Sequence, residues 1–437
     1  MYCFVLILFI ICSVSFFFNK DIFHYLNSFI WSIALVMLFL SGVILSFKFK
    51  FLQLNFKSIF KSIFKKSNSK ISTFESLSLS LAARIGVGSL SGISLAIFIG
   101  GPGTVFWMWV STILCSINTY VESYLGCLYH KRDNDNYIGG PSYYLKYGLK
   151  NNKLAMLYAI LIILSYIIGF ITIQSNTIIK SISNTFNVNN YFIIVILLLF
   201  TIIVIFKGIK RIVKLTSKIV PLMAIIYLIL GIYIIISNIN IIPLIFKNIF
   251  KDAFNFKSII SGGLIIGIQR GIFASEAGIG TSAIASSTGN NPKNEGLSQV
   301  FGIYFTTFVI CTITALIVLT SNYQSLMLND INGIEITLNA FRENLGVFGK
   351  YLLCIITVLF AYTTIISGYY YGESNLKFLN NNISKKGIFI FKILTVVLIV
   401  IGGIISSKVI WNIIDIFIAL LAIINVYAIV KLSDNVK

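Results

Sequence analysis

Residues 82–92 read AARIGVGSLSG, and residues 269–282 read QRGIFASEAGIGTS. Each stretch places glycines and small polar side chains in the middle of a long apolar run, which covers residues 76–98 in the first case and 258–288 in the second. Because hydrocarbon cannot satisfy freed N–H and C=O groups, a helix breaks inside a membrane only where its backbone lines a cavity or binds something. Glycine-interrupted segments at matching places in two halves are typical of inverted-repeat transporters with a site at the midplane.

A broken helix offers two kinds of ligand group. Amides at the start of a half-helix suit a carboxylate, and carbonyls at the end of one suit a cation. The same small residues would also serve in an unbroken helix, where they let neighbouring helices pack closely. The pattern alone leaves both interpretations open.

The composition places the whole chain in the bilayer. Of its 437 residues, 57% are hydrophobic and 11% are charged, against about 45–50% and about 25% in soluble proteins. A spanning helix needs about 20 mostly apolar residues. We therefore predict an all-α integral membrane protein of about eleven transmembrane helices, at residues 28–46, 76–98, 104–128, 153–179, 191–206, 213–237, 258–288, 297–320, 348–371, 388–404 and 409–430.

The predicted spans divide the chain into four regions. Residues 1–75 hold an apolar N-terminal segment, the first span and a basic loop, and residues 431–437 form a tail. Between them lie two sets of five helices, at 76–237 and 258–430. The segment 1–18 is either a signal-like sequence or an extra span, and the residues leave that choice open.

The basic residues predict the orientation. A net charge of +20 would suggest nucleic acid as the partner of a soluble protein, but here the Lys and Arg residues lie mostly in short loops, so no nucleic-acid partner is predicted. With 28–46 running inward, 23 of the 34 Lys and Arg residues fall on the cytoplasmic side and 8 on the other, while Arg84, Arg270 and Lys392 lie inside spans. The positive-inside rule then predicts a multi-pass cell-membrane protein with a cytoplasmic C-terminus. The loop after the first span contains an amphipathic stretch, 56–64, which we expect to lie along the membrane surface.

The sequence points away from catalysis. Its six cysteines, Cys3 and Cys12 among them, form no CxxC pair, and it has two histidines, His24 and His130. We therefore predict neither disulfides nor a Cys or His metal site. Because no Walker A sequence is present either, we predict that the protein is not an enzyme, with no cofactor beyond a coupling ion.

Several motifs together resemble one known family. They read GVGSLSG at 86–92, GGPGTVFWMWV at 100–110, GGPSYY at 139–144, GIKR at 208–211, RGIFASEAGIG at 270–280 and YYGE at 370–373. The chain resembles, in this order and over nearly its whole length, the sodium:alanine symporter family, also called alanine or glycine:cation symporters. The resemblance implies a LeuT-like fold, a five-plus-five inverted repeat preceded by one extra helix. It also implies alanine or glycine as substrate and sodium or protons as the driving ion.

The resemblance implies a substrate site at the two breaks. The substrate carboxylate would meet backbone amides at the first break, the second break would complete the cavity, and two amide side chains would face the substrate. These substrate-binding residues are Gly86, Val87, Gly88, Ser89, Gln174, Asn176, Gly278, Gly280 and Gly368. An alternative for Gln174 and Asn176 is a helix end whose amides turn toward water.

A sodium site of the kind common to this fold would use three backbone carbonyls and two hydroxyls. The carbonyls belong to Ala82, Ile85 and Phe360, and the hydroxyls to Thr363 and Thr364. Adjacent threonines in a span also often bond back to carbonyls of their own helix, which is the structural alternative.

Charged residues inside spans are candidates for function because they are costly in lipid. Glu276 could pair with Arg270 or Arg84, hold the broken helix or carry a coupling proton. A buried structural ion pair is the alternative for all three.

Two departures from the family pattern bear on substrate choice. The family's Gly-Thr-Gly-Asn reads Gly86-Val87-Gly88-Ser89, and its tryptophan before the Tyr-Gly-Glu ending is Gly368, followed by Tyr369. Loss of an indole should enlarge or reshape the pocket. We hypothesise a substrate somewhat larger than alanine, or a looser preference.

The sequence thus predicts a sodium-coupled symporter that imports small neutral amino acids by alternating access. A proton-coupled symporter of the same fold remains an alternative. So do a channel and a membrane protein that only binds amino acids.

Overall fold

The computed structural model describes residues 20–65, 70–133, 136–260, 262–324, 333–380, 383–404 and 407–437. The predicted segment 1–18, which includes Cys3 and Cys12, lies outside the described residues.

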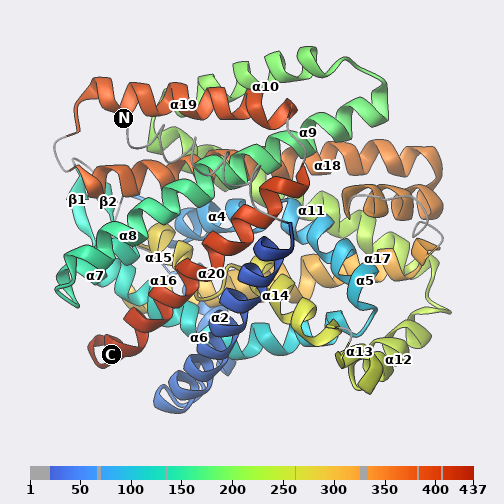
Figure 1. The fold of residues 1–437 in the computed structure, drawn as a ribbon, viewed down its shortest axis with the longest axis horizontal. Helices are drawn as coiled ribbons and strands as arrows, with labels where there is room; N and C mark the ends of the chain where they lie inside the picture. The colour runs from blue at the N-terminus through green and yellow to red at the C-terminus, as the bar shows by residue number, and fades with distance from the viewer. Residues whose placement is uncertain are drawn as a thin grey trace.

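The described chain is a bundle of helices with one short hairpin (Figure 1). The elements are α2 (Lys20–Lys48), η1 (Leu52–Leu54), α3 (Phe56–Ile63), α4 (Thr73–Arg84), η2 (Gly88–Gly92), α5 (Ile93–Gly100), α6 (Thr104–Leu128), β1 (Lys131–Asp133), β2 (Asn136–Ile138), α7 (Pro141–Tyr147), α8 (Asn152–Ile163), η3 (Leu164–Phe170), α9 (Ile171–Phe186), α10 (Asn190–Ile205), α11 (Ile209–Ser237), α12 (Ile242–Ala253), α13 (Phe256–Ile260), α14 (Gly263–Ser275), α15 (Thr281–Ser286), α16 (Pro292–Tyr304), η4 (Phe305–Cys311), α17 (Thr312–Leu319), α18 (Gly333–Leu379), α19 (Lys385–Ile404), α20 (Ser407–Lys431) and η6 (Ser433–Asn435). Figure 1 shows α2 and α20, which pack together, crossing the middle of the view, with α10 and α19 along one edge.

Eight helices of the described chain are long and apolar enough to cross a membrane. A ninth span forms if α4 is joined to the η2–α5 segment, from which it is bent by 53°. α10 and α14 are apolar but shorter than the others. The protein is therefore a helical membrane protein, and the count of eleven spans stays a prediction.

The distribution of exposed and buried side chains is that of a protein surrounded by lipid. Large apolar side chains such as Leu199, Phe200 and Ile229 are exposed on the outer helices, while polar residues such as Glu122, Asn425 and Thr364 are buried. Lipid satisfies exposed hydrocarbon but no polar group, so the polar side chains gather in the interior. The interior is thus the place where ligand groups can be found.

The hairpin corrects the all-α expectation in one small region. β1 and β2 pair antiparallel, with Arg132 opposite Tyr137. Gly140, which follows them, has φ of 125°, and a side chain there would collide with Ile284 of α15. Nδ1 of His130 donates to the carbonyl of Ser287 (2.9 Å), and burial lowers the pKa of this ring, which keeps it neutral. The hairpin and its glycines hold the end of α15.

Candidate functional site

The first glycine-rich stretch is a true break between two helices. α4 ends at Arg84 and the π-helical segment η2 begins at Gly88, so the break lies within the predicted stretch 82–92. A capping box starts α4, in which Ser72 and Glu75 satisfy each other's backbone amides. The helix is therefore well defined up to the point where its glycines release it.

The hydroxyl of Thr364 lies close to three backbone carbonyls at the end of α4. Oγ1 of Thr364, on α18, lies 2.9 Å from the carbonyl oxygen of Ala82 and 2.9 Å from that of Phe360. The carbonyl of Ala83 lies 3.5 Å from the same hydroxyl. A hydroxyl has one hydrogen to donate, so it cannot satisfy all of these carbonyls at once. The Phe360 carbonyl also accepts from the Thr363 hydroxyl, whereas the Ala82 and Ala83 carbonyls share the one hydrogen of Thr364.

Of the two other predicted sodium ligands, Thr363 lies at this cluster. Oγ1 of Thr363 lies 3.0 Å from the same Phe360 carbonyl and also faces the sulfur of Met223 at 3.7 Å. Ile85 is buried and caps α4, its amide donating to the carbonyl of Leu81. Of the two hydroxyls, that of Thr364 bridges α18 to the broken helix.

Gln174 of α9 closes the break from the side. Its Oε1 accepts a hydrogen bond from the amide of Val87 (3.3 Å). A Cβ placed on Gly86 would lie 3.1 Å from Nε2 of Gln174 and 2.5 Å from Oγ1 of Thr364. At Gly86 the broken helix, α9 and α18 therefore lie so close together that a side chain would collide with Thr364.

The remaining residues predicted at the first break have local partners. The hydroxyl of Ser89 donates to the carbonyl of Gly86 (2.8 Å), and the Ser89 amide bonds to the same oxygen. Asn176, also on α9, donates from Nδ2 to the carbonyl of Gly402 on α19 (2.9 Å). Gln174 thus faces the break while the Asn176 side chain bonds to α19.

An aromatic stack joins the two breaks. A Cβ on Gly88 would lie 3.1 Å from the ring of Phe273, which stacks on Phe170 at 5.5 Å between ring centres. Phe170 stacks on Tyr166 at 4.6 Å. Gly368 borders this stack, because a methyl group there would lie 3.5 Å from Tyr166.

The second break is held by its own acidic residue. α14 ends at Ser275, Glu276 has a left-handed backbone (φ 54°), and α15 begins at Thr281. Glu276 is buried, and its carboxylate accepts hydrogen bonds from Tyr166 (2.6 Å) and Thr281 (2.7 Å). Of the roles predicted for Glu276, this geometry fits that of holding the broken helix.

Asn425 of α20 ties the freed backbone of the second break to α6. Its Nδ2 donates to the carbonyl of Gly278 (2.9 Å) and to Oε2 of Glu122 (2.6 Å), and its Oδ1 accepts from Tyr144. Gly280 has φ of 100° and leaves no room for a side chain beside the hydroxyl of Tyr158. The predicted glycines of the second break are therefore needed for close packing and for a backbone conformation that other residues rarely adopt.

The two arginines have different partners. Arg84 donates to the hydroxyl of Ser282 on α15 (2.5 Å) and to the carbonyl of Gln299 on α16 (3.3 Å), so it links the two broken helices. Arg270 forms an ion pair with Asp415 of α20 at 3.4 Å and lies over the ring of Phe273. Arg84 is thus the arginine that bridges the two breaks directly.

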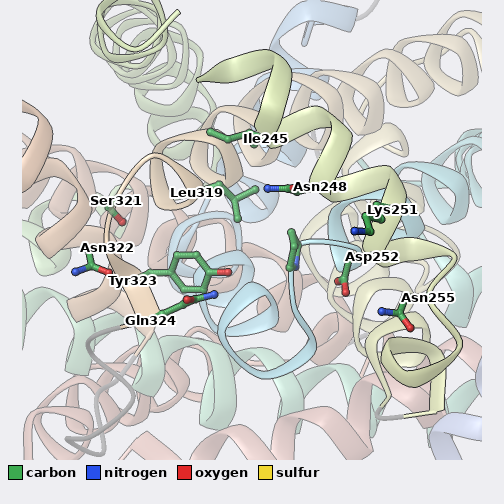
Figure 2. A pocket seen from close by; sticks show the side chains of 11 residues that line it. Ile245, Asn248, Lys251, Asp252, Asn255, Leu319, Ser321, Asn322, Tyr323 and Gln324 are labelled. Carbon is green, nitrogen blue, oxygen red and sulfur yellow. The ribbon is translucent and has the colours of Figure 1, made fainter. Parts of the chain in front are cut away.

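A polar pocket of about 450 Å³ lies at the far end of α5 (Figure 2). Lys251 and Asp252 of α12 form one wall, and Tyr323 and Gln324 face them from the chain after α17. Oδ2 of Asp252 accepts a hydrogen bond from the amide of Gly103 (2.8 Å), which fixes α12 against the Gly-Gly-Pro-Gly turn. Burial raises the pKa of the Tyr323 phenol, so at neutral pH it is a hydrogen-bond donor.

The chain matches known transporters over nearly its whole length. A profile of the sodium:alanine symporter family covers residues 16–437. The chain belongs to the sodium:alanine symporter family. Its relatives include the probable sodium/glutamine symporter GlnT of Bacillus subtilis, 37% identical over 94% of this chain and 87% of that protein. They also include the sodium/alanine symporter AgcS of Methanococcus maripaludis, 33% identical over 94% of both chains.

The fold of this family member is similar to that of other transporters. A substrate-bound, outward-open sodium-coupled sialic acid symporter superposes with a TM-score of 0.53 at 14% identity, covering 92% of this chain and 82% of that one. A manganese transporter of Eremococcus coleocola superposes with a TM-score of 0.51. The protein thus shares a fold with transporters, and its family is one of cation-coupled amino-acid symporters in membranes.

Several residues that hold the site of this symporter-family protein were not predicted from the sequence. Tyr166, Phe170 and Phe273 form the aromatic stack, and Thr281 and Asn425 bind the second break. Asn425 could have been predicted to bind a buried polar group, because an asparagine in an apolar span needs a buried partner. The aromatic residues carried no comparable signal, because rings are common on lipid-facing surfaces too.

Tyr166→Phe should destabilise this family member. The change removes the donor to Oε1 of Glu276 and leaves a buried carboxylate oxygen unsatisfied, which costs about 1–3 kcal/mol or more. We expect a lower melting temperature in detergent and weaker substrate uptake. The matched control is Tyr227→Phe, which loses an equally buried bond to the neutral hydroxyl of Thr314. Equal losses in the two variants would contradict a special role for the Tyr166–Glu276 bond.

Proposed function

We propose that the protein is a sodium-coupled symporter that imports small neutral amino acids by alternating access. The observation that carries this proposal is the meeting of the Ala82 and Phe360 carbonyls with the Thr364 hydroxyl. A group of oxygens with too few hydrogens suits a cation, and unwound carbonyls hold the coupling ion in transporters with broken helices. Sodium bound there would tie α18 to the broken helix and so order the first break.

The substrate carboxylate would bind at the amides of the first break. Gln174 Oε1 already accepts a hydrogen bond from the amide of Val87, and a carboxylate oxygen could take its place. Gln174 would then turn toward the substrate. The first break is closely packed in this structure, so Gln174 and its neighbours would have to move to admit the substrate.

Alanine or glycine is the type of substrate we propose, with glutamine as the larger candidate to test. Relatives named as a sodium/alanine symporter and as a probable sodium/glutamine symporter support both. Gly368 borders Tyr166, and an added methyl group there would make only ordinary contacts. The absence of an indole at this position is consistent with a looser preference.

The proposed arrangement in the cell membrane has eleven spans, with α2 followed by a five-plus-five inverted repeat. The short α10 and the broken α14–α15 pair would count as spans in addition to the long helices. The C-terminus would be cytoplasmic, as the basic loops predict. The polar pocket of Figure 2 would then open to the outside, where Lys251 and Asp252 could meet an arriving zwitterion.

Proton coupling is the second candidate, and a specific observation favours it. Glu122 and Glu276 are both buried near the second break, close to one guanidinium, that of Arg84. One negative charge more than positive in a dry interior would be relieved by a bound proton. Sodium remains the first proposal because the oxygen atoms around Thr364 lie directly on a broken helix.

The test is uptake of labelled alanine, glycine, serine and glutamine into proteoliposomes. One charge moved through 100 mV is worth about 2.3 kcal/mol. At about 1.4 kcal/mol for each factor of ten, this potential alone could concentrate a zwitterion roughly fortyfold, and the ion's own gradient would multiply that ratio. We expect saturable uptake that requires an inward sodium gradient. Uptake driven equally by a proton gradient without sodium would favour the second candidate, and unsaturable flux would favour a channel.

A further inference from the structure

Residues 56–65 are built from a four-residue repeat, Phe-Lys-Ser-Ile, that the transport site does not use. They read Phe-Lys-Ser-Ile-Phe-Lys-Ser-Ile-Phe-Lys, and most of them form α3. Four residues advance a helix by one turn plus about 40°, so each residue type of the repeat gathers on its own stripe. The sequence therefore gives α3 distinct apolar and basic faces.

The exposure of the side chains identifies these faces. Ile59 and Ile63 are 2% and 6% exposed and belong to the packed core. Phe56, Phe60 and Phe64 are 63%, 57% and 72% exposed. The lysines that follow each phenylalanine, at 57, 61 and 65, are exposed as well. A helix with one outward aromatic stripe beside one basic stripe is suited to the boundary between lipid chains and headgroups.

A groove of about 770 Å³ runs between α3 and the α16–η4 helix. Its walls include Phe56 and Phe60 on one side and Phe301, Phe305 and Phe308 on the other, with Ile113 of α6 between them. The hydroxyl of Tyr304, whose ring also lines the groove, is bonded to the carbonyl of Gln53 (2.9 Å). The groove is therefore lined mostly by apolar side chains, and the Tyr304 hydroxyl needs no hydrogen-bond partner from a ligand.

Lys57 is the charged residue among those that line the groove. Within the described part of the chain, Lys57, Lys61 and Lys65 form no ion pair, whereas nearby Lys48 is paired with Asp434. Lys57 at the groove, with Lys61 and Lys65 at the following turns of the same helix, matches a ligand with an anionic head and a hydrocarbon tail. The membrane supplies such a molecule directly.

We propose that this groove is a binding site for an acidic phospholipid. One acyl chain fills the space between α3 and α16–η4, and the phosphate lies against Lys57 with Lys61 and Lys65 nearby. The bound lipid holds α3 against α16, the helix whose Gln299 carbonyl accepts from Arg84. This site is separate from the two breaks, and it does not depend on what the protein transports.

Native mass spectrometry of the full-length protein tests the proposal directly. The protein in detergent is mixed with phosphatidylglycerol or with phosphatidylcholine of identical acyl chains, and the lipid that stays bound after release from the detergent is measured. We expect phosphatidylglycerol to bind at least about tenfold more tightly, since each lysine near an acidic group contributes roughly a factor of five. The triple variant Lys57→Gln, Lys61→Gln, Lys65→Gln should lose this preference. Equal binding of the two lipids by the unaltered protein would overturn the proposal.

A charge-matched control separates this site from general attraction. Lys207, Lys214 and Lys218 are exposed lysines near the start of α11, and replacing all three with glutamine removes the same net charge. This variant should keep the preference for phosphatidylglycerol. If both triple variants lose it equally, the attraction is diffuse and the proposal is wrong.

A third variant tests the groove itself without touching any lysine. Ile113→Trp places an indole in the groove from a position that is 39% exposed on α6. We expect one tightly bound phosphatidylglycerol to be lost while helical content and monodisperse elution are retained. Unchanged binding in this variant would show that no acyl chain occupies the groove. Because the readout is lipid binding, it is independent of any failure to find the transported substrate.

Discussion

Thr364→Val is expected to raise the sodium concentration for half-maximal uptake by tenfold to a hundredfold. Valine keeps the shape of the side chain and removes the hydroxyl that lies between the Ala82 and Phe360 carbonyls. Loss of one ligand to a charged group costs about 1.5–3 kcal/mol, and each 1.4 kcal/mol is a factor of about ten. Uptake in proteoliposomes at a series of sodium concentrations measures the shift.

The control for this prediction is Thr364→Ser, which keeps the hydroxyl and removes the methyl group. Its sodium dependence should stay within about threefold of that of the unaltered protein, because the oxygen cluster is retained. A valine variant with unchanged sodium dependence would mean that the hydroxyl only bonds back to its own helix. The sodium site would then have to lie elsewhere.

Gly86→Ala should reduce transport at least tenfold while leaving the fold intact. The new methyl group would lie 2.5 Å from Oγ1 of Thr364 and 3.1 Å from Nε2 of Gln174. Thr364 cannot move aside cheaply, since its hydroxyl is bonded to two helices. Overpacking of this kind costs about 1–3 kcal/mol, and here it would push apart the groups proposed to bind ion and substrate. Initial uptake rates at saturating sodium measure the effect.

Gly92→Ala provides the matched comparison in the same broken helix. A Cβ at Gly92 has no neighbour within 4 Å, so this variant should transport normally. If both variants were equally impaired, the loss would reflect the flexibility of the glycine-rich segment rather than contacts at Gly86. Elution profiles and thermal unfolding in detergent would show whether both variants are folded.

The positions of the spans and breaks could largely be predicted from the sequence. The predicted span 104–128 coincides with α6, and both breaks lie within the glycine-rich stretches. These features depend on local composition, because the length of an apolar run and the backbone freedom of glycine are properties of the residues themselves. The hairpin and the amphipathic helix α12 were not predicted, whereas the amphipathic stretch 56–64 was.

The directions of polar side chains could be predicted only in part. Gln174 and Asn176 were both expected to face the substrate, but residues two apart on a helix point in nearly opposite directions. Gln174 bonds to the broken helix and Asn176 to α19. That both side chains face the substrate stays a prediction, and which of them lies at the break could be decided only from the positions of the neighbouring helices.

Residue composition and local backbone preference by themselves determined the solvent of this protein, its helices and the two places where they break. The tertiary structure decided the partners. Glu276 bonds to Tyr166, 110 residues earlier, and Arg270 pairs with Asp415, 145 residues later. The sequence predicts that a buried charge such as Glu276 has a polar or charged partner. It does not predict which residue that partner is, because the packing of distant helices decides which side chains lie close together.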